Sequence, residues 1–176
     1  MEKRRISFYS GAREEEVLKS EEDLNRVMET YADMVRRICF LHLKNKYDTE
    51  DVFQNVYLKY LLYDKPFASG EHEKAWFARV AINACTDHLR YISRRKWVPL
   101  DVIEEESGVL DDTSSEVLEA VLSLPEKYRN VIYLHYYEEY PAVEIARILR
   151  KKENTVYSWL SRARELLRAR LGGEWA

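Results

Sequence analysis

The sequence predicts an all-α protein of two small helical domains joined by a flexible acidic linker, with a helix-turn-helix in the second domain. Apolar residues recur at spacings of three and four along most of the chain, which is the period of amphipathic helices. Only five glycines and four prolines occur in 176 residues, and this scarcity disfavours a loop-rich β protein. Residues 101–116 carry seven acidic side chains and no lysine or arginine, which is typical of a linker.

These patterns divide the chain into an N-terminal extension (1–22), a first domain (23–98), the linker (99–116) and a second domain (117–176). Of all residues, 46% are hydrophobic, enough for a packed core. The formal net charge of -3 does not by itself indicate nucleic-acid binding. Lysine and arginine nevertheless outnumber acidic residues in both predicted domains, which is a weak indication of contact with a polyanion.

Several classes of protein are disfavoured by the motifs that the sequence lacks. Cys39 and Cys85 form no CxxC pair and lie in apolar helical patterns, so we expect reduced core thiols rather than a zinc site or a disulfide. The four histidines have no ligand spacing, and there is no glycine-rich phosphate loop or nucleophile elbow. We therefore expect no enzyme activity, catalytic residue, metal or cofactor. Because no apolar run reaches ~18 residues, we also expect no membrane insertion and a cytoplasmic location.

The first domain is expected to contain three helices. Residues 24–45 form the first, and residues 48–64 form the second, with Asp48 or Thr49 as its N-cap. Residues 71–96 form one long helix. Its apolar stripe consists of Phe77, Ala81, Ala84, His88 and Ile92, and its polar, mostly basic stripe of Arg79, Asn83, Thr86, Arg90 and Arg94.

In the second domain, helices are predicted at 117–122, 129–137, 141–150 and 155–171, with Asn154 as the cap of the last one. The buried face of that last helix should consist of Val156, Leu160, Ala163 and Leu167. Two helices joined by about four residues are typical of a helix-turn-helix, whose second helix enters the major groove of DNA. An ordinary helical hairpin with a solvated basic face is the alternative.

Three stretches together resemble bacterial sigma factors of the extracytoplasmic-function (ECF) group. Residues 124–171 resemble their C-terminal DNA-binding domain, through Leu124-Pro125-Glu126 with Tyr128-Arg129, Glu144-Ile145-Ala146, Thr155-Val156 with Ser158, and Arg162-Ala163-Arg164. Residues 47–61, "YDTEDVFQNVYLKYL", resemble the helix by which sigma factors grip the polymerase clamp. Residues 75–95, "AWFARVAINACTDHLRYISRR", resemble the helix that recognises and melts the promoter.

This resemblance implies a non-enzymatic initiation factor that binds core RNA polymerase and directs it to promoter DNA. The second domain would read an upstream element in duplex DNA, and the first would capture a downstream element as a single strand. An anti-sigma factor is a further candidate partner. The alternative is a helix-turn-helix transcriptional regulator that acts without polymerase, but such a protein would not need the stretch at 47–61. The acidic linker is either a simple tether or a segment that threads toward the polymerase active site.

The resemblance implies polymerase contacts on the helix at 48–64. Acidic and amide side chains suit the basic coiled coil that a sigma helix meets in polymerase. The expected polymerase-binding residues are Asp48, Asp51, Gln54 and Asn55. For each of them an ordinary solvated helix face is the alternative, and Asp48 has a second alternative role as a cap.

Downstream-element contacts are expected on the long helix and on the loop before it. The candidate residues are Phe67, Arg79, Asn83, Arg90, Arg94 and Arg95. Melting requires a place for an unstacked base, which an aromatic ring beside basic and amide side chains offers. Phe67 is either such a ring or a core residue, whereas Trp76 is expected in the core. Arg79 and Arg90 are expected to contact phosphates or to be surface charges.

Upstream-element contacts are expected on the last helix. The candidate residues are Thr155, Tyr157, Ser158, Trp159, Ser161, Arg162 and Arg164. Those nearest the helix N-terminus are best placed for base edges, whereas the two arginines either read guanine or hold phosphates. Tyr157 and Trp159 stand where members of the group often carry lysine or arginine, so we expect the promoter preference to differ there.

Overall fold

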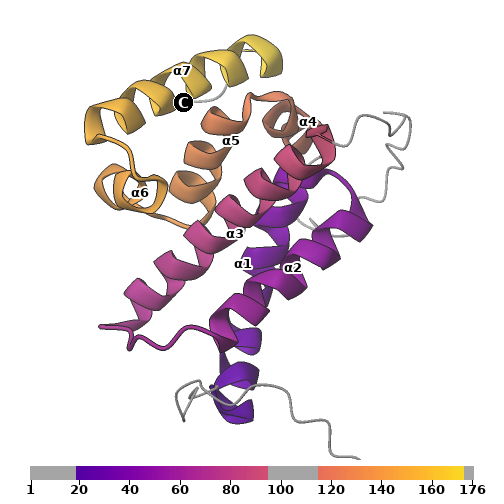
Figure 1. Cartoon of the computed structure of the whole chain (residues 1–176). Coiled ribbons are helices and arrows are strands. Elements are labelled where there is room, and N and C mark those ends of the chain that lie inside the picture. The colour runs from indigo at the N-terminus through magenta and orange to yellow at the C-terminus, as the bar shows by residue number, and fades with distance from the viewer. Residues whose placement is uncertain (1–18, 95–114, 173–176) are drawn as a thin grey trace, which may run out of the picture.

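The computed structural model describes residues 19–94 and 115–172, and every regular element in these ranges is helical, which confirms the predicted fold class (Figure 1). The helices are α1 (Glu21–Leu43), α2 (Lys46–Leu61), α3 (Gly70–Arg94), α4 (Ser115–Ser123), α5 (Glu126–Ile132), α6 (Ala142–Leu149) and α7 (Glu153–Leu171), with a π-helical segment η1 (Tyr133–Tyr137) directly after α5. The predicted linker up to residue 114, most of the predicted N-terminal extension and Arg95 lie outside the described residues. The last two residues of the predicted linker, 115 and 116, belong to α4, so the second domain begins slightly earlier than predicted.

Helices α1, α2 and α3 form the first bundle. Its core is strongly aromatic: the Phe77 ring centroid lies 4.9 Å from that of Tyr31 and 5.4 Å from that of Tyr57. Cys39 and Cys85 are buried and free, as the sequence predicts. Ser20 begins α1 with a capping box, in which its side chain accepts a hydrogen bond from the Asp23 backbone N–H.

Two predicted N-caps are wrong. Helix α2 begins at Lys46 rather than near Asp48, because Asn45 has an extended backbone and its side chain accepts a hydrogen bond from the Asp48 N–H at 3.1 Å. Helix α7 begins at Glu153, so Asn154 lies inside its first turn and Lys152 is the cap, without a side-chain hydrogen bond. The acidic Glu153 then lies at the positive end of the helix dipole, where it is favourable.

The second bundle consists of α4 to α7 and contains the predicted helix-turn-helix in α6 and α7. The inner face of α7 is buried as predicted, through Val156, Leu160, Ala163 and Leu167. Helix α5 begins at Glu126, three residues earlier than predicted, directly after Pro125. Helix α6 ends at Arg150, whose φ of 53° is left-handed, and the Lys151 N–H then bonds back to the Ala146 carbonyl at 2.8 Å.

The two bundles pack against each other, and α3 of the first bundle contacts α6 of the second (Figure 1). Arg129 of α5 is buried and donates hydrogen bonds to the carbonyl of Leu41 in α1 and to that of Leu124. His42 of α1 lies 2.6 Å from Asn130, measured between Nε2 and Oδ1. Polar contacts therefore contribute to this junction.

Candidate polymerase and nucleic-acid interfaces

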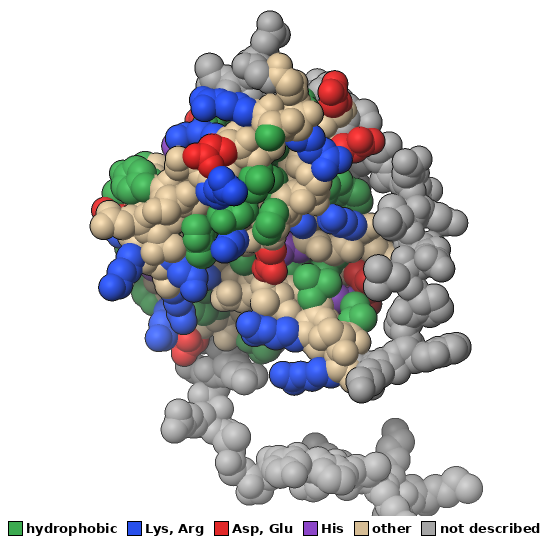
Figure 2. Space-filling model, turned by 90° about the horizontal axis from the view of Figure 1, so that it is seen from above, with side chains coloured by type: hydrophobic (Ala, Val, Ile, Leu, Met, Phe, Trp, Pro, Cys, Tyr) green, Lys and Arg blue, Asp and Glu red, His purple; other side chains and the backbone are tan. Residues whose placement is uncertain are grey.

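Helix α7 presents a polar outer face on the second bundle. Tyr157, Ser158, Ser161 and Arg162 are exposed, whereas Thr155 and Trp159 are half-buried. Figure 2, which looks down on this side of the molecule, shows lysine and arginine side chains spread across the face among hydrophobic ones. Because the inner face of α7 is fixed in the core, its outer side chains are held on a rigid helix, as reading of base edges requires.

The two aromatic residues near the start of α7 lie in different environments. Tyr157 is 55% exposed. Trp159 packs partly against the core, and the Lys127 ammonium group lies 5.9 Å from its ring centroid. Of the two aromatic replacements that the sequence singles out, Tyr157 is therefore the one more accessible to a partner.

The two arginines of α7 that are candidate DNA contacts, Arg162 and Arg164, have different partners. Arg162 makes an exposed ion pair with Glu165 on the same helix, with 2.7 Å between Nη1 and Oε2. Such a surface pair contributes only about 0–1 kcal/mol, so a phosphate or a base can replace the carboxylate. Arg164 is half-buried, and its Nε donates a hydrogen bond to the hydroxyl of Tyr136 at 2.6 Å.

The polar stripe of α3 is divided between solvent and the junction of the two bundles. Asn83, Arg90 and Arg94 are exposed. Arg79 is half-buried and lines a groove shared with the second bundle. The Thr86 hydroxyl makes hydrogen bonds to the Ile82 carbonyl at 2.9 Å and to Glu126 Oε1 of α5 at 3.1 Å. In this structure, the exposed members of the stripe are thus Asn83 and the two arginines at its C-terminal end.

Phe67 belongs to an aromatic cluster at the edge of the first bundle. Its ring is stacked with that of Tyr63 at 5.1 Å between centroids and lies edge-on to Trp76 at 5.8 Å. Trp76 is buried, as expected for a core residue, whereas Phe67 is half-buried. The cluster therefore extends from the core to the surface, with Phe67 and Tyr63 as its half-buried members.

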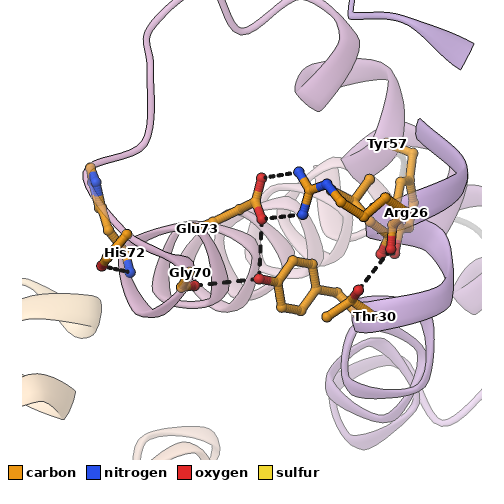
Figure 3. A network of polar contacts seen from close by, with 9 residues as sticks. Arg26, Thr30, Tyr57, Gly70, His72 and Glu73 are labelled. Atoms are coloured by element: carbon orange, nitrogen blue, oxygen red, sulfur yellow. Dashed lines mark hydrogen bonds and ion pairs between the residues drawn. The ribbon is translucent and has the colours of Figure 1, made fainter. Parts of the chain in front are cut away.

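A polar network that the sequence does not predict fixes the start of α3 (Figure 3). Arg26 of α1 makes two hydrogen bonds of 2.8 Å to the two carboxylate oxygens of Glu73. The Tyr31 hydroxyl donates to Glu73 at 3.1 Å. These bonds from Arg26 lower the pKa of the Glu73 carboxyl, and burial raises the pKa of Tyr31 to about 12. No local pattern connects residues so far apart in sequence.

One face of α2 combines polar and apolar exposed side chains. Asp51, Gln54 and Asn55 are exposed as predicted, but Asp48 is paired with His88 of α3 at 3.0 Å. Leu58 of this helix and Leu62, its C-cap, are 58% and 68% exposed. Their four-residue spacing on an otherwise polar side of the helix is a sequence pattern from which their exposure could have been predicted. Exposed apolar groups with a polar rim are typical of a protein interface.

Family models match both bundles in the predicted order. Residues 27–95 match sigma-70 region 2, and residues 114–167 match sigma-70, region 4. The chain is 30% identical over 140 residues to RNA polymerase sigma factor SigV of Bacillus subtilis, covering 78% of this chain and 84% of that protein. It is 27% identical over 162 residues to the ECF RNA polymerase sigma factor SigW of the same organism, covering 82% and 87%.

Solved structures share the fold. The sigma factor RpoE of Bartonella quintana, solved with the anti-sigma factor NepR, matches with a TM-score of 0.70 and 20% identity, over 88% of this chain and 99% of that chain. CnrH, solved with the cytosolic domain of CnrY, matches with a TM-score of 0.59 and 18% identity, over 89% and 92%. Among the described helices of the present chain, none is long and apolar enough to cross a membrane.

Proposed function

Because this chain belongs to the ECF group of sigma factors, which bind core RNA polymerase and direct promoter-specific initiation, we propose how its elements divide that work. Helix α2 docks on polymerase through Asp51, Gln54 and Asn55, with Leu58 and Leu62 beside them. Helix α3 and the loop before it hold the downstream element as a single strand. Helix α7 reads the upstream element in duplex DNA. The work is binding and positioning, without an enzymatic step by this chain.

One observation carries the upstream assignment: α7 is anchored by a fully apolar inner face and leaves polar and aromatic side chains exposed on the other side. Tyr157 and Ser158 lie near the N-terminal end, which in a helix-turn-helix approaches base edges. The Ser158 hydroxyl donates to the Asn154 carbonyl at 2.8 Å, so its oxygen remains available as an acceptor. Arg162 and Arg164, one to two turns later, provide positive charge to DNA.

The downstream assignment rests on charge and aromatic surface that lie on one bundle. Asn83, Arg90 and Arg94 form an exposed polar and basic line along α3. Phe67 lies at the outer edge of the aromatic cluster near the start of the same helix. A base that leaves the stack gains about 1–3 kcal/mol from an aromatic partner, and the basic line attracts the backbone. Arg79 lies in the groove between the two bundles, so it would become part of this surface only if the second bundle separated from the first.

Further partners follow from the relatives. RpoE and CnrH were each solved with a protein that binds them, and this supports an anti-sigma factor as a partner of the present chain. Its place of action would be the cytoplasm, where polymerase and promoters are found. A helix-turn-helix regulator that acts without polymerase does not account for the match of residues 27–95 to region 2.

The direct test is run-off transcription on genomic fragments with core polymerase, in the presence and absence of the full chain. We expect new start sites that require the protein. Asp51→Arg together with Asn55→Arg should abolish them and leave duplex binding by α7 intact, because the two changes reverse the charge of the α2 face only. If the chain adds no start site, or if the double variant initiates normally, the proposed division of work is wrong.

A further inference from the structure

The helix that follows Pro125 contains one π-helical turn. The Glu138 N–H bonds to the Tyr133 carbonyl at 3.2 Å, five residues earlier, instead of the usual four. Tyr133 and Leu134 are buried in this segment, whereas Tyr136 and Tyr137 are 49% and 44% exposed. Two neighbouring tyrosines are thus presented on the surface by a locally widened helix.

These two tyrosines contact different parts of the molecule. The Tyr137 ring stacks on Tyr133 at 5.4 Å between centroids, and the Arg37 guanidinium of the first bundle lies 4.7 Å above it. Tyr136 contacts the last helix instead. Its hydroxyl oxygen accepts the hydrogen bond from Arg164 Nε at 2.6 Å, and the Arg164 guanidinium carbon lies 5.6 Å from its ring centroid.

The orientation of the Tyr136 ring is itself fixed. The His135 ring is edge-on to it at 4.9 Å and 79°, and His135 Nδ1 lies 3.0 Å from the Tyr140 carbonyl oxygen. A chain of contacts therefore connects the backbone before α6 to the guanidinium group on α7.

We propose that Tyr136 is a positioning residue for DNA binding: it holds Arg164 by Nε so that the two terminal nitrogens project from α7 toward a backbone phosphate beside the upstream element. This inference rests on the proposed role of α7. A guanidinium has five donors in one plane, and a bond at Nε leaves both terminal nitrogens able to take two phosphate oxygens together. Among the described residues, none accepts a hydrogen bond from those terminal nitrogens.

A comparison with Arg162 shows what the hydrogen bond from Arg164 to Tyr136 contributes. Arg162 is paired with a carboxylate of its own helix, which a DNA phosphate must displace. Arg164 has a neutral partner instead, the Tyr136 hydroxyl, which orients the guanidinium group without neutralising its charge. Binding of DNA then requires little ordering of the Arg164 side chain, and ordering of a long side chain otherwise weakens binding roughly two- to tenfold.

The test uses the full chain and a fluorescent DNA duplex of random sequence, because a phosphate contact does not require the promoter. Tyr136→Phe removes the hydroxyl and keeps the ring, and Tyr137→Phe is the matched control. We expect Tyr136→Phe to weaken duplex binding roughly two- to tenfold and Tyr137→Phe to leave it unchanged. Arg164→Ala should weaken binding further and reduce the slope of log affinity against log salt by about 0.9, the loss of one phosphate contact.

The decisive readout is the double variant Tyr136→Phe/Arg164→Ala, which should bind no more weakly than Arg164→Ala alone. An additional loss in the double variant overturns the positioning role, because Tyr136 then acts without Arg164. A normal Tyr136→Phe beside a weakened Arg164→Ala overturns it as well, while the role of α7 stands. If Arg162→Ala, Arg164→Ala and Tyr157→Ala all bind normally, the proposed role of α7 itself is wrong. Urea unfolding of every variant, followed by circular dichroism, serves as the check of folding of the second bundle.

Discussion

At the scale of single residues, Arg150 is the clearest case of a side chain in an unfavourable backbone conformation. It ends α6 with a φ of 53°, a left-handed conformation that costs a residue with a Cβ atom roughly 1–2 kcal/mol. Glycine is the residue that such a helix end prefers, because it has no Cβ atom. Lys44 ends α1 in the same conformation, with a φ of 54°.

Arg150→Gly is therefore expected to stabilise the second bundle. The gain should be about 0.5–1 kcal/mol, since the relief of the left-handed strain is partly offset by the greater freedom of glycine in the unfolded chain. Urea unfolding, followed by circular dichroism, measures it. Arg150→Ala removes the same charge but keeps the Cβ atom, so it should bring no comparable gain; an equal gain in both variants would assign the effect to charge.

Arg162 allows a test of whether α7 recognises the base sequence of the promoter. Arg162→Ala should lower the affinity for a promoter duplex by about 1–3 kcal/mol if the side chain reads a base, and the loss should be confined to promoters that carry the preferred base pair. Binding to a panel of duplexes with single base-pair changes measures this. An equal loss on every duplex assigns Arg162 to a phosphate instead, and equal binding by mutant and wild type removes it from the DNA interface.

At the scale of elements, the network of Arg26, Tyr31 and Glu73 fixes the start of α3 against α1 (Figure 3). Because α3 follows the loop that carries Phe67, these bonds also determine where that loop ends. Glu73 has a lowered pKa, chiefly through its hydrogen bonds with Arg26. Its ionised form is thus favoured by folding.

Glu73→Gln should destabilise the first bundle by about 1–3 kcal/mol, the usual cost of losing a charged hydrogen-bond partner. The wild-type contribution should be present above pH ~4.3, the ordinary pKa of glutamate, and should be lost as the pH falls through the lowered pKa of the folded state. Urea unfolding at several pH values tests both statements. Glu71→Gln changes an exposed carboxylate two residues earlier and should show neither effect.

How far the sequence predicts an element depends on the range of the forces that define it. The inner face of α7 was predicted residue by residue, because burial on one side produces a helical period. The caps of α2 and α7 were wrong by two to four residues, since several adjacent side chains were chemically suitable and only the backbone selects among them. The π-helical segment could not be predicted either, because apolar spacing over five residues does not distinguish it from an α-helix.

At the scale of the whole molecule, the period of α3 predicts which residues avoid the core of the first bundle but not what they meet instead. Thr86 and Arg79 belong to the polar stripe, yet they lie toward the second bundle in this structure. The buried Arg129 and its bond to the Leu41 carbonyl were equally beyond prediction. Contacts between segments far apart in sequence produce no local pattern.

His42 is expected to make the stability of the junction between the bundles depend on pH. Burial lowers its pKa, Arg129 adds to that effect, and Glu126 and Asn130 oppose it. The unfolded chain takes up a proton near pH ~6.5, whereas the folded chain does so only at lower pH, so stability should fall as the pH drops below ~6.5. Urea unfolding at several pH values between neutral and mildly acidic tests this, and His42→Gln should show a smaller slope. Identical slopes in both proteins would contradict it.

The burial of both cysteines has a practical consequence for chemical reactivity. Cys39 and Cys85 are the two thiols of the chain, and both lie in the core of the first bundle. A thiol reagent can reach them only when α1 and α3 separate. The rate at which the two thiols are labelled therefore reports how often that bundle opens. A cysteine introduced on the outer face of α7 would react far faster than either native thiol. A dye could therefore be attached there selectively, without removing a native cysteine.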